Sequence, residues 1–198
     1  MAREPKRRLL VVCEGARTEP DYIDGFTRAS GDAIVELRVL GGVGAPITIV
    51  ATAKALREDG TAKAKSDPNE AFNEVWCVFD RDEHPSFKEA IDMAQANGLK
   101  LAISNPCFEL WLLLHFRDSP GARHRHEVQR MLRDDHLPGY DKKLKFEDVA
   151  GGVEQATRRA KRLLSDAQAL GDGLFKNPTT SVYGLTESIA GVPRGDGS

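Results

Sequence analysis

The sequence E-V-W-C-V-F-D-R-D-E-H, Glu74 to His84, joins a short apolar run to a charged end. Val75 to Phe79 has the length and the β-branched and aromatic composition of a buried strand. Asp80 and Asp82 follow, two residues apart, so an extended chain would place both carboxylates on one side. Paired carboxylates at a strand end favour a divalent cation with oxygen ligands, Mg²⁺ or Mn²⁺. A polar turn after a buried strand is the alternative, because Asp is also a common turn residue.

Three further stretches of the first half have strand character and alternate with helical stretches. These predicted strands cover residues 8–13, 33–40 and 99–103. Strands that alternate with helices favour right-handed crossovers and a parallel sheet, so the predicted fold class is α/β. Glu14 directly follows the first strand, as Asp80 and Asp82 follow the third. Because open α/β sheets bind ligands at the carboxyl ends of their strands, Glu14 and the aspartate pair are expected in one crevice.

A helix is predicted directly after Glu14, with Thr18 as its N-cap and its end near Ala29. Glu19 then lies in the first turn, where an acidic side chain favours the helix dipole. Glu19 therefore has a structural explanation as well as a functional one, whereas Glu14 has no such structural role.

An almost uniformly apolar segment, S-N-P-C-F-E-L-W-L-L-L-H-F, covers Ser104 to Phe116 and predicts a buried helix. Asn105 is its expected cap, with Pro106 in the first turn. Glu109 lies within the apolar run, and a buried carboxylate requires a cation, a metal or a structural salt bridge. His115 fits a hydrogen-bonded core histidine better than a metal ligand.

The second half is more helical and more basic. Basic residues outnumber acidic ones from Arg123 to Arg162, and an amphipathic helix is predicted over residues 153–170. A tyrosine among lysines can contact nucleic acid by stacking and by phosphate pairing, although an exposed turn explains the same pattern. The expected nucleic-acid contacts are Lys142, Lys143, Lys145, Arg158 and Arg162. R-H-R-H at residues 123–126 fits a solvated helix face.

Bulk composition fits one α/β domain with a small annex, since the 198 residues are 40% hydrophobic and 29% charged. The apolar runs are too short and too interrupted to cross a membrane. Three cysteines without a C-x-x-C pair indicate buried free thiols in a reducing cytoplasm and argue against structural zinc. Cytoplasmic localisation is the expectation.

Several motifs together resemble the Toprim domain, and specifically the RloB-like family of Toprim proteins. They are V-C-E-G-x-x-T-E at residues 12–19, D-R-D-E-H at 80–84, the 104–116 segment, and N-P-T-T-S-V at 177–182. The resemblance implies a Toprim-like fold in which Glu14, Asp80 and Asp82 hold Mg²⁺ and Glu14 also takes part in proton transfer. Glu83 and His84 stand where Toprim proteins usually have a third acid, so either is a candidate accessory residue, with Glu19, Asn105 and His115.

The same resemblance implies a nuclease of bacterial defence against phage that cuts RNA, with transfer RNA as a candidate substrate, or DNA. A partner protein or signal of the defence system would trigger it. The resemblance and the elements divide the chain into a Toprim-like core (1–116), a basic helical extension packed on it (117–190) and a disordered tail (191–198).

Two alternatives stay open from the sequence. One is a module that binds metal and nucleic acid, or a nucleotide, and cuts only within a larger complex. The other is a phosphatase with an Asp-x-Asp nucleophile. The phosphatase is disfavoured because such enzymes usually place the motif on the first strand and follow it with Thr, whereas Glu83 and His84 follow here.

Overall fold

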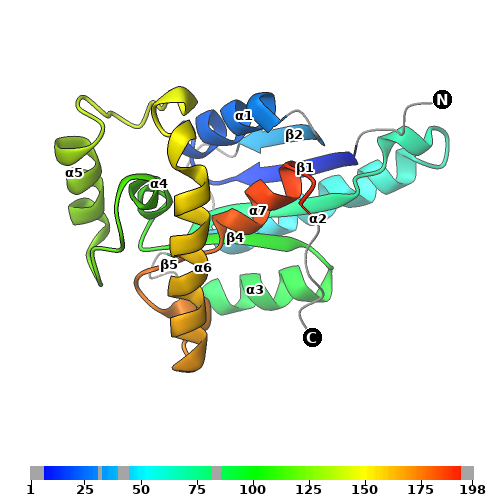
Figure 1. Cartoon of the computed structure of the whole chain (residues 1–198). Helices are drawn as coiled ribbons and strands as arrows, with labels where there is room; N and C mark the ends of the chain where they lie inside the picture. The colour runs from blue at the N-terminus through cyan, green and yellow to red at the C-terminus, as the bar shows by residue number, and fades with distance from the viewer. Residues whose placement is uncertain (1–6, 31–32, 40–44, 82–85, 193–198) are drawn as a thin grey trace.

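The computed structural model describes residues 7–30, 33–39, 45–81 and 86–192. A five-stranded sheet in the order β2-β1-β3-β4-β5 forms its centre (Figure 1). The first four strands pair in parallel, and β5 pairs with β4 in antiparallel orientation. The strands are β1 (Arg7–Cys13), β2 (Ala33–Val39), β3 (Glu74–Asp80), β4 (Lys100–Asn105) and β5 (Thr179–Thr180). The predicted α/β class with a Toprim-like, mainly parallel sheet is confirmed.

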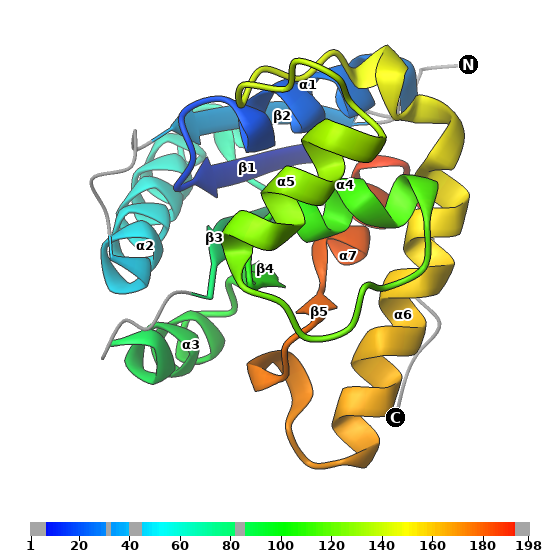
Figure 2. The same ribbon diagram turned by 90° about the vertical axis from the view of Figure 1, so that its left-hand side faces the viewer.

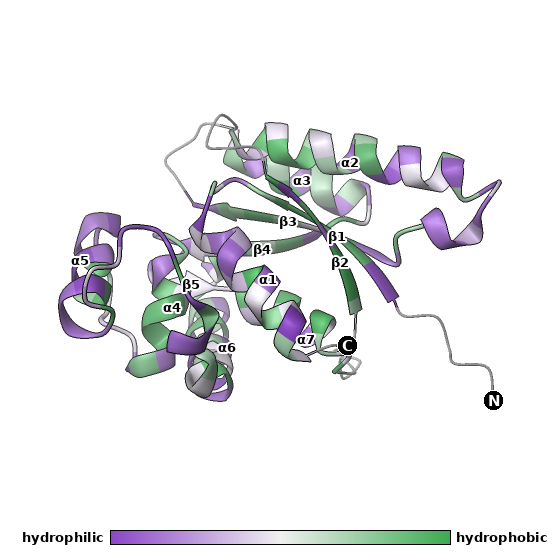
Figure 3. Cartoon of the chain, turned by 90° about the horizontal axis from the view of Figure 1, so that it is seen from above, coloured by the Kyte–Doolittle hydropathy of each residue, from purple (hydrophilic) through white to green (hydrophobic). Residues whose placement is uncertain are grey.

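Helices cover both faces of the sheet, as Figure 3 shows from above. One face carries α2 (Pro46–Lys63) and α3 (Phe87–Ala96). The other face carries α1 (Thr18–Ser30), α4 (Glu109–Phe116) and α7 (Val182–Ile189), with α5 (Arg125–Asp135) and α6 (Val153–Ala169) packed outside α4. Four short 3₁₀ helices complete the fold: η1 (Pro68–Glu70), η2 (Phe146–Asp148), η3 (Ala150–Gly152) and η4 (Gly173–Phe175). No helix in the described ranges has the length and hydropathy needed to cross a bilayer.

Strand β1 lies between β2 and β3 and separates two hydrophobic cores. Its side chains alternate, so Leu9, Val11 and Cys13 pack on the side of α1 and α4, while Leu10 and Val12 pack on the side of α2 and α3. A strand buried on both faces is expected to be continuously apolar, and this explains the run L-L-V-V-C.

Helix α4 lies in the larger core, and Leu110 to Leu114 have no solvent-exposed surface. The sheet contacts it on one side, and α5 and α6 contact it on the other. A helix enclosed in this way can be apolar on every face, as its sequence is. Residues 117–190 therefore share one core with the preceding part of the chain. The proposed domain boundary at residue 116 stays a prediction.

Helix α4 begins later than predicted. Asn105 remains in β4, where it pairs with Thr179 of β5, so it cannot cap the helix. The Asn105–Pro106 peptide bond is cis, and α4 begins at Glu109. The predicted disordered tail lies outside the described residues from position 193 onward.

The short strand β5 was not predicted. It covers the end of β4, and the residue after it, Ser181, continues the cover. The Ser181 hydroxyl accepts a hydrogen bond from the Ile103 backbone N–H at 2.9 Å, and the Ser181 N–H donates to the Ile103 carbonyl at 2.9 Å. Two residues of regular pairing are too few to give a sequence pattern of alternating polarity.

Candidate functional site

The carboxyl ends of β1 and β3 meet at one edge of the sheet, as predicted. Glu14 directly follows β1, and its backbone N–H donates to the Val78 carbonyl of β3 at 3.0 Å. Asp80 is the last residue of β3 and is 9% exposed. Glu14 and Asp80 both line a cavity of about 410 Å³, here called the carboxylate pocket. The parallel register of two neighbouring strands therefore brings together two acids that are 66 positions apart in the sequence.

Helix α1 adds Glu19 to this pocket. The helix begins at Thr18, so Glu19 lies in its first turn with 8% of its surface exposed. The Glu19 carboxylate lies directly over Gly15, where a Cβ atom would come within 2.0 Å of Oε2. The glycine after Glu14 thus leaves the space into which Glu19 folds.

Glu109 closes the pocket from α4. It is the first residue of that helix and is 2% exposed. Its carboxylate accepts hydrogen bonds from the Tyr140 hydroxyl at 3.2 Å and from Gln129 Nε2 at 3.3 Å, and it forms an ion pair with Lys142. Lys142 is therefore a cationic partner of the buried Glu109.

Lys142 lies on the connection between α5 and η2, which runs beside α1 in Figure 2. It is the one non-glycine residue with positive φ (77°) among those described. This conformation costs about 1–2 kcal/mol. Hydrogen bonds of the flanking chain hold it, since Thr18 Oγ1 donates to the Lys142 carbonyl at 3.0 Å and the Leu144 N–H donates to Asp21 at 3.1 Å.

Arg125, the first residue of α5, supplies a second cation. Its guanidinium Nη2 lies 2.8 Å from Asp80 Oδ2. The sequence suggested only a solvated face for R-H-R-H, because charge alone does not show which arginine of a run turns inward. Arg17 also lines the carboxylate pocket and was not predicted as a site residue.

The crowded acids shift one another's pKa values. Burial raises the pKa of Asp80 well above its ordinary value, the charges of Glu19 and Glu109 raise it further, and Arg125 opposes both. Burial also raises the pKa of Glu19 to about 7, with further contributions from Glu109 and Glu14 against a backbone hydrogen bond that lowers it. Burial would raise the pKa of Glu109 too, but the charge and hydrogen bond of Lys142 hold it below its ordinary value.

The donor chemistry of the pocket fits a hard divalent cation, because Glu14 and Asp80 present carboxylate oxygens at neighbouring strand ends. Within the described ranges, no group of three or more His, Cys, Asp or Glu side chains lies close enough together to hold a metal ion. Asp82, Glu83 and His84 lie outside the described residues. Metal binding by Glu14, Asp80 and Asp82 therefore stays a prediction.

Two predicted accessory residues lie outside the pocket lining. His115 is a core histidine, 6% exposed, with its ring nitrogens 3.2 Å from the Tyr22 hydroxyl and 2.9 Å from the Trp111 carbonyl. Burial lowers the pKa of His115 to about 4, so its ring is neutral at physiological pH. Asn105 is 4% exposed at the end of β4.

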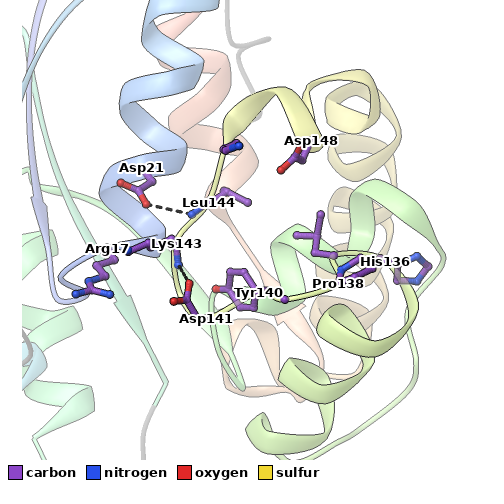
Figure 4. A pocket seen from close by; sticks show the side chains of 12 residues that line it. Arg17, Asp21, His136, Pro138, Tyr140, Asp141, Lys143, Leu144 and Asp148 are labelled. Atoms are coloured by element: carbon purple, nitrogen blue, oxygen red, sulfur yellow. Dashed lines mark hydrogen bonds between the residues drawn. The ribbon is translucent and has the colours of Figure 1, made fainter.

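The predicted nucleic-acid contacts divide among three surfaces. Lys142 lines the carboxylate pocket. Lys143 and Lys145 line a second cavity of about 950 Å³, here called the strap cavity because residues 137–145 form its wall (Figure 4). Arg158 and Arg162 line a third cavity, of about 420 Å³, and Arg162 Nη2 lies 3.3 Å from Asp118. The amphipathic pattern placed both arginines on one helix face but could not show that this face turns away from the carboxylates.

Comparison with known proteins assigns the family. The sequence matches the family described as RloB-like protein over residues 9–189. No curated protein and no solved structure matches it significantly. The family match includes the strand ends that carry Glu14 and Asp80 and the helix that carries Glu109. The chain belongs to the RloB-like protein family.

Proposed function

We propose that the chain is a metal-dependent nuclease that cleaves phosphodiester bonds of RNA, with transfer RNA as a candidate substrate, or of DNA in bacterial defence against phage. The main support is the convergence of Glu14 and Asp80, at the ends of two neighbouring parallel strands, in a pocket that also contains cations. The RloB-like family resemblance supports the defence context. Acids alone would repel a phosphodiester, whereas Arg125, Lys142 and Arg17 give it partners of opposite charge.

In this proposal Glu14, Asp80 and Asp82 hold one or two Mg²⁺ or Mn²⁺ ions. The bound metal would supply Lewis-acid polarisation of the scissile phosphate. Glu14, the less buried of the two described acids, also accepts the proton of the attacking nucleophile. Glu109 pairs with Lys142 and so holds its ammonium group at the pocket. Arg125 neutralises Asp80 and is within reach of a phosphate bound there.

A binding module that cuts only within a larger defence complex is the second candidate. One observation favours it: Arg125 pairs with Asp80 and Lys142 pairs with Glu109, so the chain supplies its own counterions for two of the acids. In that case a partner protein or signal would displace these cations before metal or substrate enters.

Cleavage by the purified full-length chain separates the two candidates. Total transfer RNA, messenger RNA, and single- and double-stranded DNA would be incubated with Mg²⁺, Mn²⁺ or EDTA. Asp80→Ala should abolish metal-dependent cleavage, by a factor of about 10³ or more, because it removes a strand-end ligand. Asp92→Ala is the matched control, because Asp92 is an exposed aspartate on α3, outside the carboxylate pocket. This variant should cleave like the wild type.

The thermal melts of both variants establish that they are folded. A folded Asp80→Ala variant that cleaves at the wild-type rate would contradict the assignment of Asp80. If the wild type cuts no substrate although calorimetry detects bound Mn²⁺, the binding module becomes the better description.

A further inference from the structure

The strap cavity adjoins the carboxylate pocket. Arg17 and Asp141 line both, so the two hollows share a wall. Tyr140 also belongs to this wall, since it lines the strap cavity while its hydroxyl contacts Glu109 and Thr18, which line the carboxylate pocket. A ligand in the strap cavity would therefore lie next to the proposed cleavage site.

The cavity contains three cations that have no ion-pair partner in the part of the chain that the structure describes. Among the described residues, no carboxylate lies within ion-pair distance of Arg17, Lys143 or Lys145, and all three are exposed. Figure 4 shows Arg17 and Lys143 close together at one end of the cavity, with Asp148 at the opposite side. Such a pair of free cations matches a phosphate group.

Two of the three lining carboxylates accept backbone hydrogen bonds, which fix their orientation but leave their negative charge in place. Asp21 accepts the backbone N–H of Leu144 at 3.1 Å, and Asp141 accepts the backbone N–H of Lys143 at 3.3 Å. The backbone of residues 137–145 thus holds both carboxylates in place. Asp148 is the remaining acid of the lining and lies away from Arg17.

Apolar groups complete the cavity. Leu137, Pro138 and the ring of Tyr140 line it together with the cations. Cations that pair with phosphate beside an aromatic ring on which a base can stack are the recurring features of sites for single-stranded nucleic acid. A volume of about 950 Å³ is at the upper end of small-ligand cavities and is enough for one or two unpaired nucleotides.

We propose that the strap cavity binds an unpaired nucleotide next to the scissile phosphate, with Arg17, Lys143 and Lys145 on its phosphates and Tyr140 beside its base. This makes single-stranded polynucleotide the substrate class. The inference rests on the proposed nuclease function, because the bound nucleotide would be part of the substrate. The binding itself can be measured without cleavage.

The test is fluorescence anisotropy of the full-length chain in EDTA, where no metal-dependent cleavage interferes. The probes are single-stranded RNA and DNA of one sequence, about 12 nucleotides long, and the corresponding DNA duplex. Lys143→Ala/Lys145→Ala should weaken single-strand binding about tenfold and lower the salt dependence of the affinity between about 50 and 200 mM salt, because phosphate contacts release counterions. Lys143→Arg/Lys145→Arg should retain the binding.

Lys54→Ala/Lys65→Ala is the control, because it removes the same charge from the α2 side of the sheet and should change the affinity less than twofold. Equal losses in both alanine pairs, or tighter binding of the duplex than of either single strand, would overturn the inference. The RNA and DNA probes show which sugar the cavity accepts.

Failure of this inference is distinguishable from failure of the nuclease. Single-strand binding that depends on Lys143 and Lys145 supports the cavity even if no substrate is cut. The converse result is that Asp80→Ala abolishes cleavage while Lys143→Ala/Lys145→Ala binds single strands as tightly as the wild type. That result would support the nuclease and show that the strap cavity does not bind the substrate.

Discussion

Each of two ion pairs at the carboxylate pocket joins an acid from the first half of the chain to a cation from the second half. The first half supplies the acids from element ends, with Asp80 closing β3 and Glu109 opening α4. The second half supplies the cations that pair with them, Arg125 and Lys142. The acids are more enclosed than their partners: the side chains of Asp80 and Glu109 are 12% and 3% exposed, against 31% and 50% for Arg125 and Lys142.

The exposed fractions of these side chains indicate which members of the site are fixed. Short side chains mounted on a sheet and on a buried helix have little freedom, whereas lysine and arginine have long side chains with many rotamers. We therefore regard the acids as the permanent part of the site and the cations as groups that can exchange their partners when a phosphate or a metal arrives. Three sets of variants test this contrast.

Substituting Lys142 should destabilise the protein more than substituting Glu109, although both changes remove the same ion pair. Lys142→Met should lower the free energy of unfolding by about 2–3 kcal/mol at pH 7, because a buried carboxylate loses its counterion; the half-exposed lysine keeps the loss below that of a fully buried pair. Glu109→Gln should cost about 1 kcal/mol, because the amide can still bond Tyr140 and Lys142 can reach water. Urea unfolding measures both.

The pH dependence sharpens this prediction. Lys142 holds the pKa of Glu109 below its ordinary value, so the stabilisation is present above the unfolded pKa and is lost as the pH falls through the folded pKa. The deficit of Lys142→Met should accordingly shrink as the pH falls below about 4. Equal losses for the two variants at all pH values would show that the contrast between fixed acids and mobile cations is wrong.

Glu19→Gln should stabilise the protein at alkaline pH. The pKa of Glu19 is raised from 4.5 to about 7, so the folded state holds this proton more tightly, and stability falls as the pH rises between these values. Removing the charge should gain about 1–2 kcal/mol near pH 8. Thermal melts from acidic to alkaline pH measure the effect. The control is Asp24→Asn on the exposed side of the same helix, for which we expect a change below about 0.5 kcal/mol.

Gly15→Ala should have the smallest effect, a loss of about 1 kcal/mol, because its Cβ atom would displace the Glu19 carboxylate. Gly151→Ala is the control, since nothing lies within 4 Å of a Cβ atom there. If Glu19 is the obstacle, the loss should disappear in the double variant Gly15→Ala/Glu19→Ala, a coupling that urea unfolding of the four proteins measures. Additive losses would place the strain elsewhere.

The acidic part of the site was predictable because it follows from strand order. Once Arg7–Cys13 and Glu74–Asp80 are recognised as parallel strands, the residues at their ends must share one edge of the sheet. Glu109 was detectable as a charge in a run otherwise apolar enough to be buried.

The positions of the cations relative to the pocket were not predictable, for two physical reasons. The position of Lys142 at the pocket depends on its positive φ and on the path of residues 137–145. Neither gives a periodic pattern in the sequence. Arg158 and Arg162 show the opposite problem, because a basic helix face is visible in the sequence whereas its direction in the molecule depends on how α6 packs on α4. The locally basic sequence therefore predicted nucleic-acid contacts without indicating where they would lie.

The pairing of β5 and Ser181 with β4 has a consequence for any shortened form of the protein. An uncovered strand at the border of a sheet offers free N–H and C=O groups to other chains and promotes aggregation. The segment from Thr179 to Ser181 blocks that border from Ile103 to Asn105. A chain cut before residue 179 would therefore expose a self-association surface, and its loss of activity would report insolubility rather than a missing substrate contact.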